Sequence, residues 1–165
     1  MQKLIPFNAE TRSRTGFSHK VIIDFAAIAL GGANTTLTVQ LVPGSTLNVT
    51  VPGTGTFPAG MTCLRVAINL ITAFDFSDAA INSLLLEIGD GGSTARYMAQ
   101  TEIAVDGTEV PFKVGQTGFS YLVADGIDAK FTVAGGASPT MAECTSGKVE
   151  IYLSLVDLND LAVPI

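Results

Sequence analysis

The sequence predicts an all-β protein built as an antiparallel β-sandwich or barrel. Apolar and polar residues alternate along several segments, as in strands with one face on a core and the other toward solvent. Turn-forming pairs such as Asp-Gly and Gly-Gly separate these segments. Their spacing corresponds to roughly eight to ten strands, as expected of a sandwich or barrel.

Three segments are predicted to be strands with one solvated face: residues 35–42, 47–51 and 148–158. In the last of these, one face carries the apolar side chains Val149, Ile151, Leu153 and Leu155. The opposite face carries Glu150, Tyr152, Ser154 and Val156. This arrangement is typical of a strand at the surface of a sandwich.

Two further predicted strands, residues 21–30 and 62–74, are apolar on both faces. In the first of them, Asp24 is the one polar residue on its face. A strand that is apolar on both faces needs cover on both faces. We expect a second sheet to cover one side, and a loop or another subunit to cover the other.

The single helical candidate is residues 77–85, with Ser77 or Asp78 as its N-cap and a length of one or two turns. Residues 1–16 are predicted to be an N-terminal arm, and residues 17–165 a single β-sandwich domain. The apolar residues 161–165 suit packing either on a neighbouring molecule or on their own domain.

The composition is unusually poor in charge. Charged residues make up 15% of the 165 residues, against about 25% in an average protein, and 47% are hydrophobic. Such a chain can cover its surface with Thr, Ser, Asn and Gly, or bury part of it against other subunits. We expect both, with a merely hydrophobic monomer as the alternative.

The net charge of -6 argues against a nucleic-acid-binding protein, which normally carries a basic patch. The N-terminal region is locally basic, with Lys3, Arg12, Arg14, His19 and Lys20. It suits an acidic partner surface or DNA, or is simply solvated. The start of the chain lacks a signal-peptide pattern, and the best apolar run is too short to span a membrane. We therefore expect no nucleic-acid or membrane partner.

Candidate catalytic and metal-binding residues are few. His19 is the single histidine, and no serine lies in a G-x-S-x-G turn. Zinc would have to use His19, Cys63 and Cys144, which have no recognised spacing. Without an export signal, the two cysteines are expected to be reduced thiols, with a disulfide as the alternative.

Calcium, phosphate and paired-carboxylate sites are also unsupported. Glu87 and Asp90 lie beside glycines but lack a calcium-loop pattern, which favours a β-turn with a surface Asp90. Nothing in the sequence pairs the acids Asp24, Glu87, Glu102 and Glu150 for glycoside chemistry. We predict no enzyme, no cofactor, and no catalytic, cofactor-binding or metal-binding residue. Aromatic residues, which form the platforms of sugar-binding grooves, make up only 7% of the chain.

One succession of motifs resembles a known family. Leu86-Glu87-Ile88-Gly89-Asp90-Gly91 is followed by Arg96-Tyr97, and the chain closes on Thr145-Ser146-Gly147-Lys148-Val149-Glu150-Ile151. This order, which covers residues 72–158, resembles small structural proteins encoded among the virion genes of tailed bacteriophages.

The resemblance implies a jelly-roll or similar β-sandwich fold and a capsid decoration, or cement, protein. Such a protein would assemble as a homodimer or homotrimer and bind the major capsid protein or other virion proteins. Its location would be the virion, after assembly in the host cytoplasm. The alternatives are another virion β protein of the neck, tail or fibre, and a carbohydrate-binding β-sandwich module.

Overall fold

A computed structural model of the chain describes residues 4–42, 61–104, 109–115, 119–120 and 126–157. Its strands are β1 (Leu4–Pro6), β2 (His19–Asp24), β3 (Thr36–Val42), β4 (Met61–Phe76), β5 (Ile81–Asp90), β6 (Ser93–Glu102), β7 (Phe112–Val114), β8 (Phe119–Ser120), β9 (Ile127–Gly135) and β10 (Cys144–Asp157). Its helices are α1 (Ala9–Thr15), α2 (Phe25–Ala29) and the 3-10 turn η1 (Met141–Glu143).

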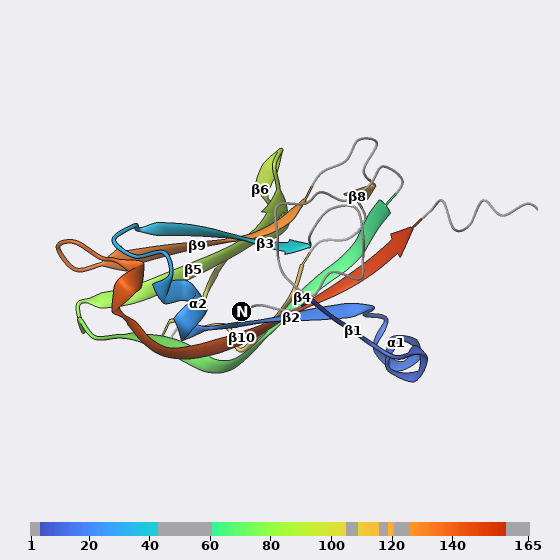
Figure 1. Cartoon of the computed structure of the whole chain (residues 1–165), viewed down its shortest axis with the longest axis horizontal. Coiled ribbons are helices and arrows are strands. Elements are labelled where there is room, and N and C mark those ends of the chain that lie inside the picture. Colours follow the sequence, from blue (N-terminus) through green and yellow to red (C-terminus); the bar gives the residue numbers. More distant parts are fainter. Residues whose placement is uncertain (1–3, 43–60, 105–108, 116–118, 121–125, 158–165) are drawn as a thin grey trace, which may run out of the picture.

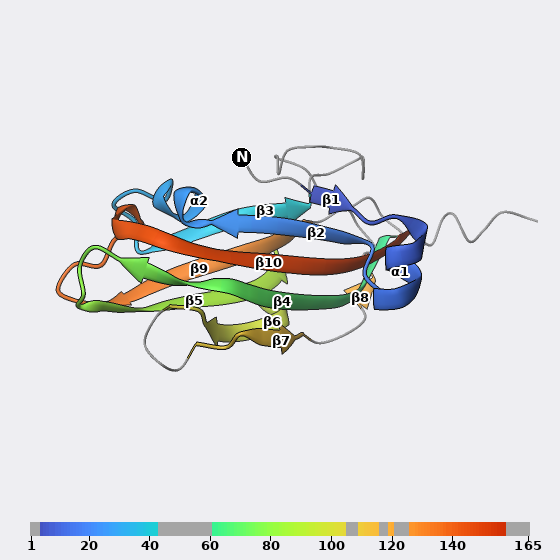
Figure 2. The same cartoon turned by 90° about the horizontal axis from the view of Figure 1, so that it is seen from below.

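The described strands form two antiparallel sheets that pack face to face (Figures 1 and 2). Sheet A has the order β1-β2-β10-β4-β7, with β8 also paired to β4, and sheet B has the order β3-β9-β5-β6. The chain changes sheet at each step from β2 to β5 and again from β8 to β10, so that each sheet mixes early and late strands. This is the double Greek key of a jelly roll, and it confirms the predicted fold class.

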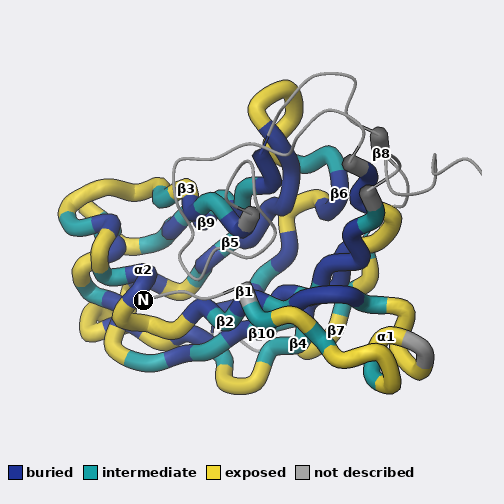
Figure 3. The backbone as a smooth tube through the Cα atoms, turned by 45° about the vertical axis from the view of Figure 1, so that its right-hand side comes forward, coloured by how far each residue is buried: buried dark blue, intermediate teal, exposed yellow. Residues whose placement is uncertain are grey.

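The core lies between the two sheets. Buried residues follow the strands, whereas α1 and many connections are exposed (Figure 3). Strand β10 confirms the predicted alternation, because its inward side chains are all buried: Val149, Ile151, Leu153 and Leu155. Strand β9 faces them from sheet B with Ile127, Ala129, Phe131 and Val133. The two inner faces together form the hydrophobic core expected of a sandwich.

Strand β4 forms where residues 62–74 predicted it, but its alternation is interrupted. Leu155 lies opposite Cys63 and Ser154 lies opposite Arg65, which leaves Leu64 as an extra residue. Ile71 is extra in the same way, because the register shifts between Leu70 and Thr72. Each extra residue reverses the face of those beyond it, as β-bulges do. A strict alternation over residues 62–74 would place Cys63 and Val66 on opposite faces, whereas both are buried.

The helix predicted over residues 77–85 does not form. Asp78 accepts a hydrogen bond from the backbone N–H of Ala80 at 2.9 Å, which closes a turn instead of starting a helix. Strand β5 begins at Ile81 and pairs with both β6 and β9. A central strand of sheet B, with Leu84 and Leu86 buried in the core, outweighs the local helix propensity.

The segment predicted as a strand over residues 21–30 is half strand and half helix. Strand β2 ends at Asp24, whose carboxylate accepts a hydrogen bond from the N–H of Ala27 at 3.0 Å. Asp24 is thus the N-cap of α2 and not a lone polar residue of a strand. Ala27 and Ile28 bury the inner side of α2, so the apolar run covers the core without a second strand face.

The described part of the N-terminal region is ordered against sheet A. Strand β1 pairs antiparallel with β2, and Asn8 caps α1, which ends at Gly16 with a φ of 71°. The division into an arm (1–16) and a domain (17–165) stays a prediction. The strand predicted at 47–51 and the apolar tail at 161–165 lie outside the described residues. No helix within the described ranges is long and apolar enough to cross a membrane.

Candidate binding surface on sheet A

The outer face of sheet A is defined by the register of its strands. One cross-strand row, taken from β2 through β10 and β4 to β7, consists of Lys20, Tyr152, Ala67 and Val114. The neighbouring row consists of Ile22, Glu150, Asn69 and Phe112. Backbone pairing therefore places an ion pair, an amide, two aromatic rings and three aliphatic side chains on one face of four adjacent strands.

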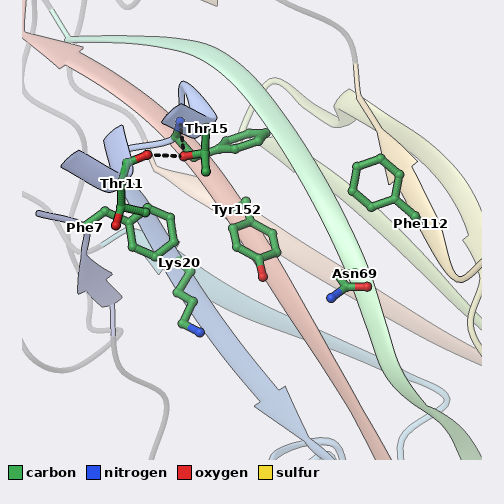
Figure 4. A pocket seen from close by; sticks show the side chains of 8 residues that line it. Phe7, Thr11, Thr15, Lys20, Asn69, Phe112 and Tyr152 are labelled. Carbon is green, nitrogen blue, oxygen red and sulfur yellow. Dashed lines mark hydrogen bonds between the residues drawn. The ribbon is translucent and has the colours of Figure 1, made fainter. Parts of the chain in front are cut away.

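A groove of about 520 Å³ crosses this face (Figure 4). We call it the aromatic groove; it is lined by Phe7, Thr11, Thr15, Phe17, Lys20, Asn69, Phe112 and Tyr152. One side comes from α1 and the residues that flank it, the floor from the central strands, and the other side from β7. The groove thus combines α1 and its flanking residues with four strands, β2, β4, β7 and β10.

A polar network lies on the floor of the groove. Lys20 Nζ lies 2.9 Å from Glu150 Oε1, and the Tyr152 hydroxyl donates to Glu150 Oε2. Burial and the Glu150 carboxylate raise the pKa of Tyr152 to about 12, so the hydroxyl stays protonated at neutral pH. Burial disfavours a charged Glu150, but the hydrogen bonds from Tyr152 and Lys20, with the nearby lysine charges, outweigh it and lower the pKa of Glu150.

Asn69 of β4 lies beside this network, and its amide opposes the rise in the pKa of Tyr152. The linked side chains themselves come from β2 and β10. Because Lys20, Glu150 and Tyr152 each have a partner within the chain, this network is held in place by contacts of the chain itself.

The N-terminal side of the groove is an aromatic cluster. The ring of Tyr152 lies 6.1 Å from that of Phe7 and 5.7 Å from that of Phe17, at interplanar angles of 34° and 49°. The guanidinium of Arg65 lies 5.7 Å from the centre of the Phe17 ring, a cation–π contact. The rings pack against one another and do not form a coplanar platform.

Beside the groove, β4 and β7 carry exposed apolar side chains that we call the apolar strip. Leu64 and Ile71 project at the two irregularities of β4 and are 44% and 49% exposed. Phe112 and Val114, on β7 between them, are 58% and 50% exposed. Lys113, the charged residue of β7, is tied to β6, because its Nζ donates to Thr101 Oγ1 at 2.6 Å and to the carbonyl of Ala99.

The structure places His19 away from the groove. His19 faces the core with 5% of its surface exposed, and its Nδ1 lies 2.8 Å from Ser18 Oγ. Burial, followed by the positive charge of Arg12, lowers the pKa of His19 to about 4. The side chain is a neutral, buried part of the start of β2.

The candidate calcium residues have structural partners. Asp90 is buried, not the surface residue that we expected. Its Oδ1 accepts from the N–H groups of Gly92 and Ser93, and its Oδ2 pairs with Arg96 Nε. Glu87 lies on β5 with its Oε2 3.5 Å from Lys130 Nζ. The described residues contain no cluster of three or more potential metal ligands.

The remaining candidates are dispersed. Glu102 accepts from Ser83 Oγ at 2.6 Å and from the N–H of Leu84 at 2.8 Å, which joins β6 to β5. Cys63 and Cys144 are buried and are not bonded to each other, and their reduced state stays a prediction. They lie at opposite ends of the pairing between β4 and β10.

Sequence reasoning missed the aromatic groove. It identified Glu150 and Tyr152 only as part of the solvated face of a strand, and it assigned Phe7 to the N-terminal arm. Phe112 belongs to a three-residue strand that has too few residues to show a period. Phe7 and Phe17, which lie on either side of Arg12 and Arg14 in the sequence, were the one available signal.

No family model matches the chain, and no curated protein matches it. Among solved structures, one similar chain belongs to the cyanophage Pam1 capsid asymmetric unit, with 20% identity over 80% of this chain and 81% of that chain, and a TM-score of 0.40. Another belongs to the acidic stable capsid structure of Helicobacter pylori bacteriophage KHP30, with 10% identity over 83% of this chain and 96% of that chain, and a TM-score of 0.39. Both are structures of phage capsids.

Proposed function

We propose that this chain is a non-enzymatic structural protein of a phage virion, a decoration protein that binds the assembled capsid shell as a homodimer or homotrimer. The virion setting is supported by the resemblance of residues 72–158 to small phage structural proteins. Those residues supply the central strands of both sheets, β10 and β4 in sheet A and β9 and β5 in sheet B. The observation that carries the proposal of self-association is the apolar strip.

The strip has the character of an interface core. It extends from Leu64 to Ile71 along β4, about 23 Å at the rise of a strand. Its members are large, apolar and half exposed, and the charged side chain of β7 is turned away from it. The cores of protein interfaces are likewise apolar and depleted of charge.

Strand β7 also lies at the end of sheet A. It pairs with β4 on one side, and no further strand pairs with it among the described residues. An edge strand offers unpaired backbone groups that a second chain can use. The strip and this edge together suit a contact between two copies of the chain.

The oligomer would act on the shell by linkage. A ligand that binds the assembled state and not the free subunits shifts the equilibrium toward assembly. An oligomer that makes several weak contacts with the shell binds it more tightly than one subunit does. After the first contact forms, the others form at high effective concentration. A rigid sandwich that offers little charge is suited to this role.

The test uses mass photometry of the full chain, alone and with isolated capsids. We expect a dimer or trimer that binds the capsids and raises their melting temperature. The double substitution Ile71→Lys and Val114→Lys should give a monomer, because it places charge in the strip. Leu30→Lys is the matched control, since Leu30 is an apolar residue, 85% exposed, at the C-cap of α2.

Two results would contradict the proposal. A monodisperse monomer that ignores assembled capsids would remove the decoration role. An oligomer that persists in the double variant would remove the strip as its interface.

A further inference from the structure

We propose that the exposed face of α2 is the surface through which each subunit binds the capsid shell. This face, which we call the α2 patch, consists of exposed apolar residues on α2 and beside it: Phe25, Ala26, Leu30, Ala33 and Ala142. The inference rests on the proposed virion function, because it takes the shell as the partner. It goes beyond that function, since it assigns shell binding and self-association to two different surfaces.

Helix α2 is apolar on both of its sides. The inner side, Ala27 and Ile28, is buried in the core. The outer side carries Phe25, which is 42% exposed, and Leu30, which is the most exposed large apolar side chain of the described residues. A helix that is hydrophobic all round is normally buried, whereas a surface helix normally has a polar outer face. The outer side of α2 therefore lacks the cover that its composition requires.

The patch lies in a part of the chain that has no charge. Residues 25–42 and 131–142 include no Asp, Glu, Lys or Arg. The acidic residues that adjoin α2 and η1 in the sequence are engaged within the chain. Asp24 accepts from the N–H of Ala27, and Glu143 accepts from the N–H and the hydroxyl of Thr140. The patch thus has the apolar, charge-depleted character of an interface core.

The patch is held in shape by contacts between α2 and η1, which lie side by side (Figure 1). The N–H of Ala142 donates to the carbonyl of Gly32 at 2.9 Å, and the N–H of Met141 donates to the carbonyl of Asn34 at 3.1 Å. A Cβ on Gly31 would lie 2.8 Å from the Cβ of Met141, so the end of α2 packs closely on η1. Because the surface is formed in the free chain, little order is lost when it binds.

The α2 patch and the apolar strip lie on different parts of the molecule. Helix α2 follows β2, and sheet A places β10 and β4 between β2 and β7. In Figure 2, α2 and β7 lie at opposite margins of the molecule. One subunit can therefore use both surfaces at the same time.

A protein of the shell fits the patch better than a second copy or a membrane does. If the strip already closes a dimer or trimer, a second self-contact would link these oligomers into open chains. A membrane-binding segment sets Lys or Arg beside its apolar side chains, and residues 25–42 include neither. An uncharged protein surface suits a patch whose two large side chains are one aromatic and one aliphatic anchor.

The test measures co-sedimentation of the full chain with capsids that lack it, taken from the phage that encodes it. Leu30→Lys should weaken this binding at least about tenfold, because an ammonium group would have to leave water at an apolar contact. Leu30→Ala and Phe25→Ala should weaken it by smaller factors, since they only remove contact area. Mass photometry should show the same oligomer for all three variants, because the apolar strip is unchanged.

Thr94→Lys is the matched control. Thr94 is exposed on β6, which lies at the opposite edge of sheet B from β3. The lysine adds the same charge there and should leave capsid binding unchanged. Thermal melting of every variant separates lost binding from lost folding.

Photo-crosslinking identifies the partner of the patch directly. A p-benzoylphenylalanine residue in place of Leu30 should crosslink to capsid protein on illumination, whereas the same residue in place of Thr94 should not.

The inference is overturned if Leu30→Lys binds capsids as tightly as the unmodified chain does, or if it becomes a monomer. It is also overturned if position 30 crosslinks to another copy of the chain and not to capsid protein. In each of these cases, capsid binding by the unmodified chain still supports the virion proposal. An unmodified chain that ignores capsids would remove both proposals.

Discussion

Ser18 and His19 form a buried polar pair at the start of β2, with His19 Nδ1 2.8 Å from Ser18 Oγ. Ser18 Oγ also donates to the carbonyl of Leu153 at 3.1 Å and accepts from the N–H of Leu155 at 2.8 Å. These contacts join β2 to β10 in the core. Because the site is buried, the imidazole is neutral, and its pKa is lowered to about 4.

This pair predicts a loss of stability in acid. The unfolded chain binds a proton on His19 near pH 6.5, whereas the folded chain resists doing so until about pH 4. The contribution of His19 is therefore complete above pH 6.5 and is lost as the pH falls from 6.5 to 4. At about 1.4 kcal/mol per pKa unit, the loss is on the order of 3 kcal/mol. Urea unfolding across this range measures it.

His19→Asn is the variant that isolates the effect. Asparagine can place a polar group near Ser18 Oγ but does not titrate. We expect the slope of stability against pH between 4 and 6.5 to become shallower in this variant. An unchanged slope would assign the acid sensitivity to other groups.

A second prediction concerns the turn between β5 and β6. The Asp90 side chain is fully buried, bonds to two backbone N–H groups and pairs with Arg96. Asp90→Ala should lower the free energy of unfolding by about 3 kcal/mol, because it leaves these donors without an acceptor. Asp90→Asn should cost less, since its amide oxygen can still accept from the N–H groups. Asp78→Ala, in an exposed turn, is the control and should cost under about 1 kcal/mol.

A third prediction concerns Gly147. Its φ is 128°, and a Cβ placed there would lie 2.3 Å from Cδ1 of Phe74. Gly147→Ala therefore combines backbone strain with a clash against a buried ring and should cost at least about 2 kcal/mol. Gly32→Ala is the matched control, because Gly32 also has a positive φ but a Cβ there has no neighbour within 4 Å. Equal costs for the two variants would show that Phe74 yields without penalty.

The strands that the sequence predicted best are those with an uninterrupted period of two. In β10, the alternation from Val149 to Leu155 confirms the prediction because each inward residue meets the opposite sheet. In β4, Leu64 and Ile71 are extra residues, and nothing local distinguishes them from regular positions. Bulges depend on the partner strand, which the pattern of one segment does not contain.

The helices and the groove show the same limit. Asp24 was visible as a polar interruption, but its role as an N-cap depends on the chain leaving the sheet at that point. The aromatic groove depends on residues 7, 17, 112 and 152, which come together only through the topology of sheet A. Local alternation was enough to predict the two sheets. It could not predict the aromatic groove, because the groove is formed by distant segments whose positions depend on the register between strands.

The last prediction concerns the cysteines. Burial, which is the larger cause for both, raises the pKa of Cys63 and of Cys144 to about 12. Reaction with a disulfide reagent requires the thiolate and access to it, so neither thiol should react in the native protein at pH 8. Their positions, at opposite ends of the pairing between β4 and β10, exceed the Cα separation of about 7 Å that a disulfide allows. Both thiols should therefore react with Ellman's reagent once the chain is unfolded without reductant. In the native protein, a thiol that reacts quickly would show that one end of this pairing opens. In the unfolded chain, the absence of reactive thiols would show a disulfide bridge between two copies of the chain.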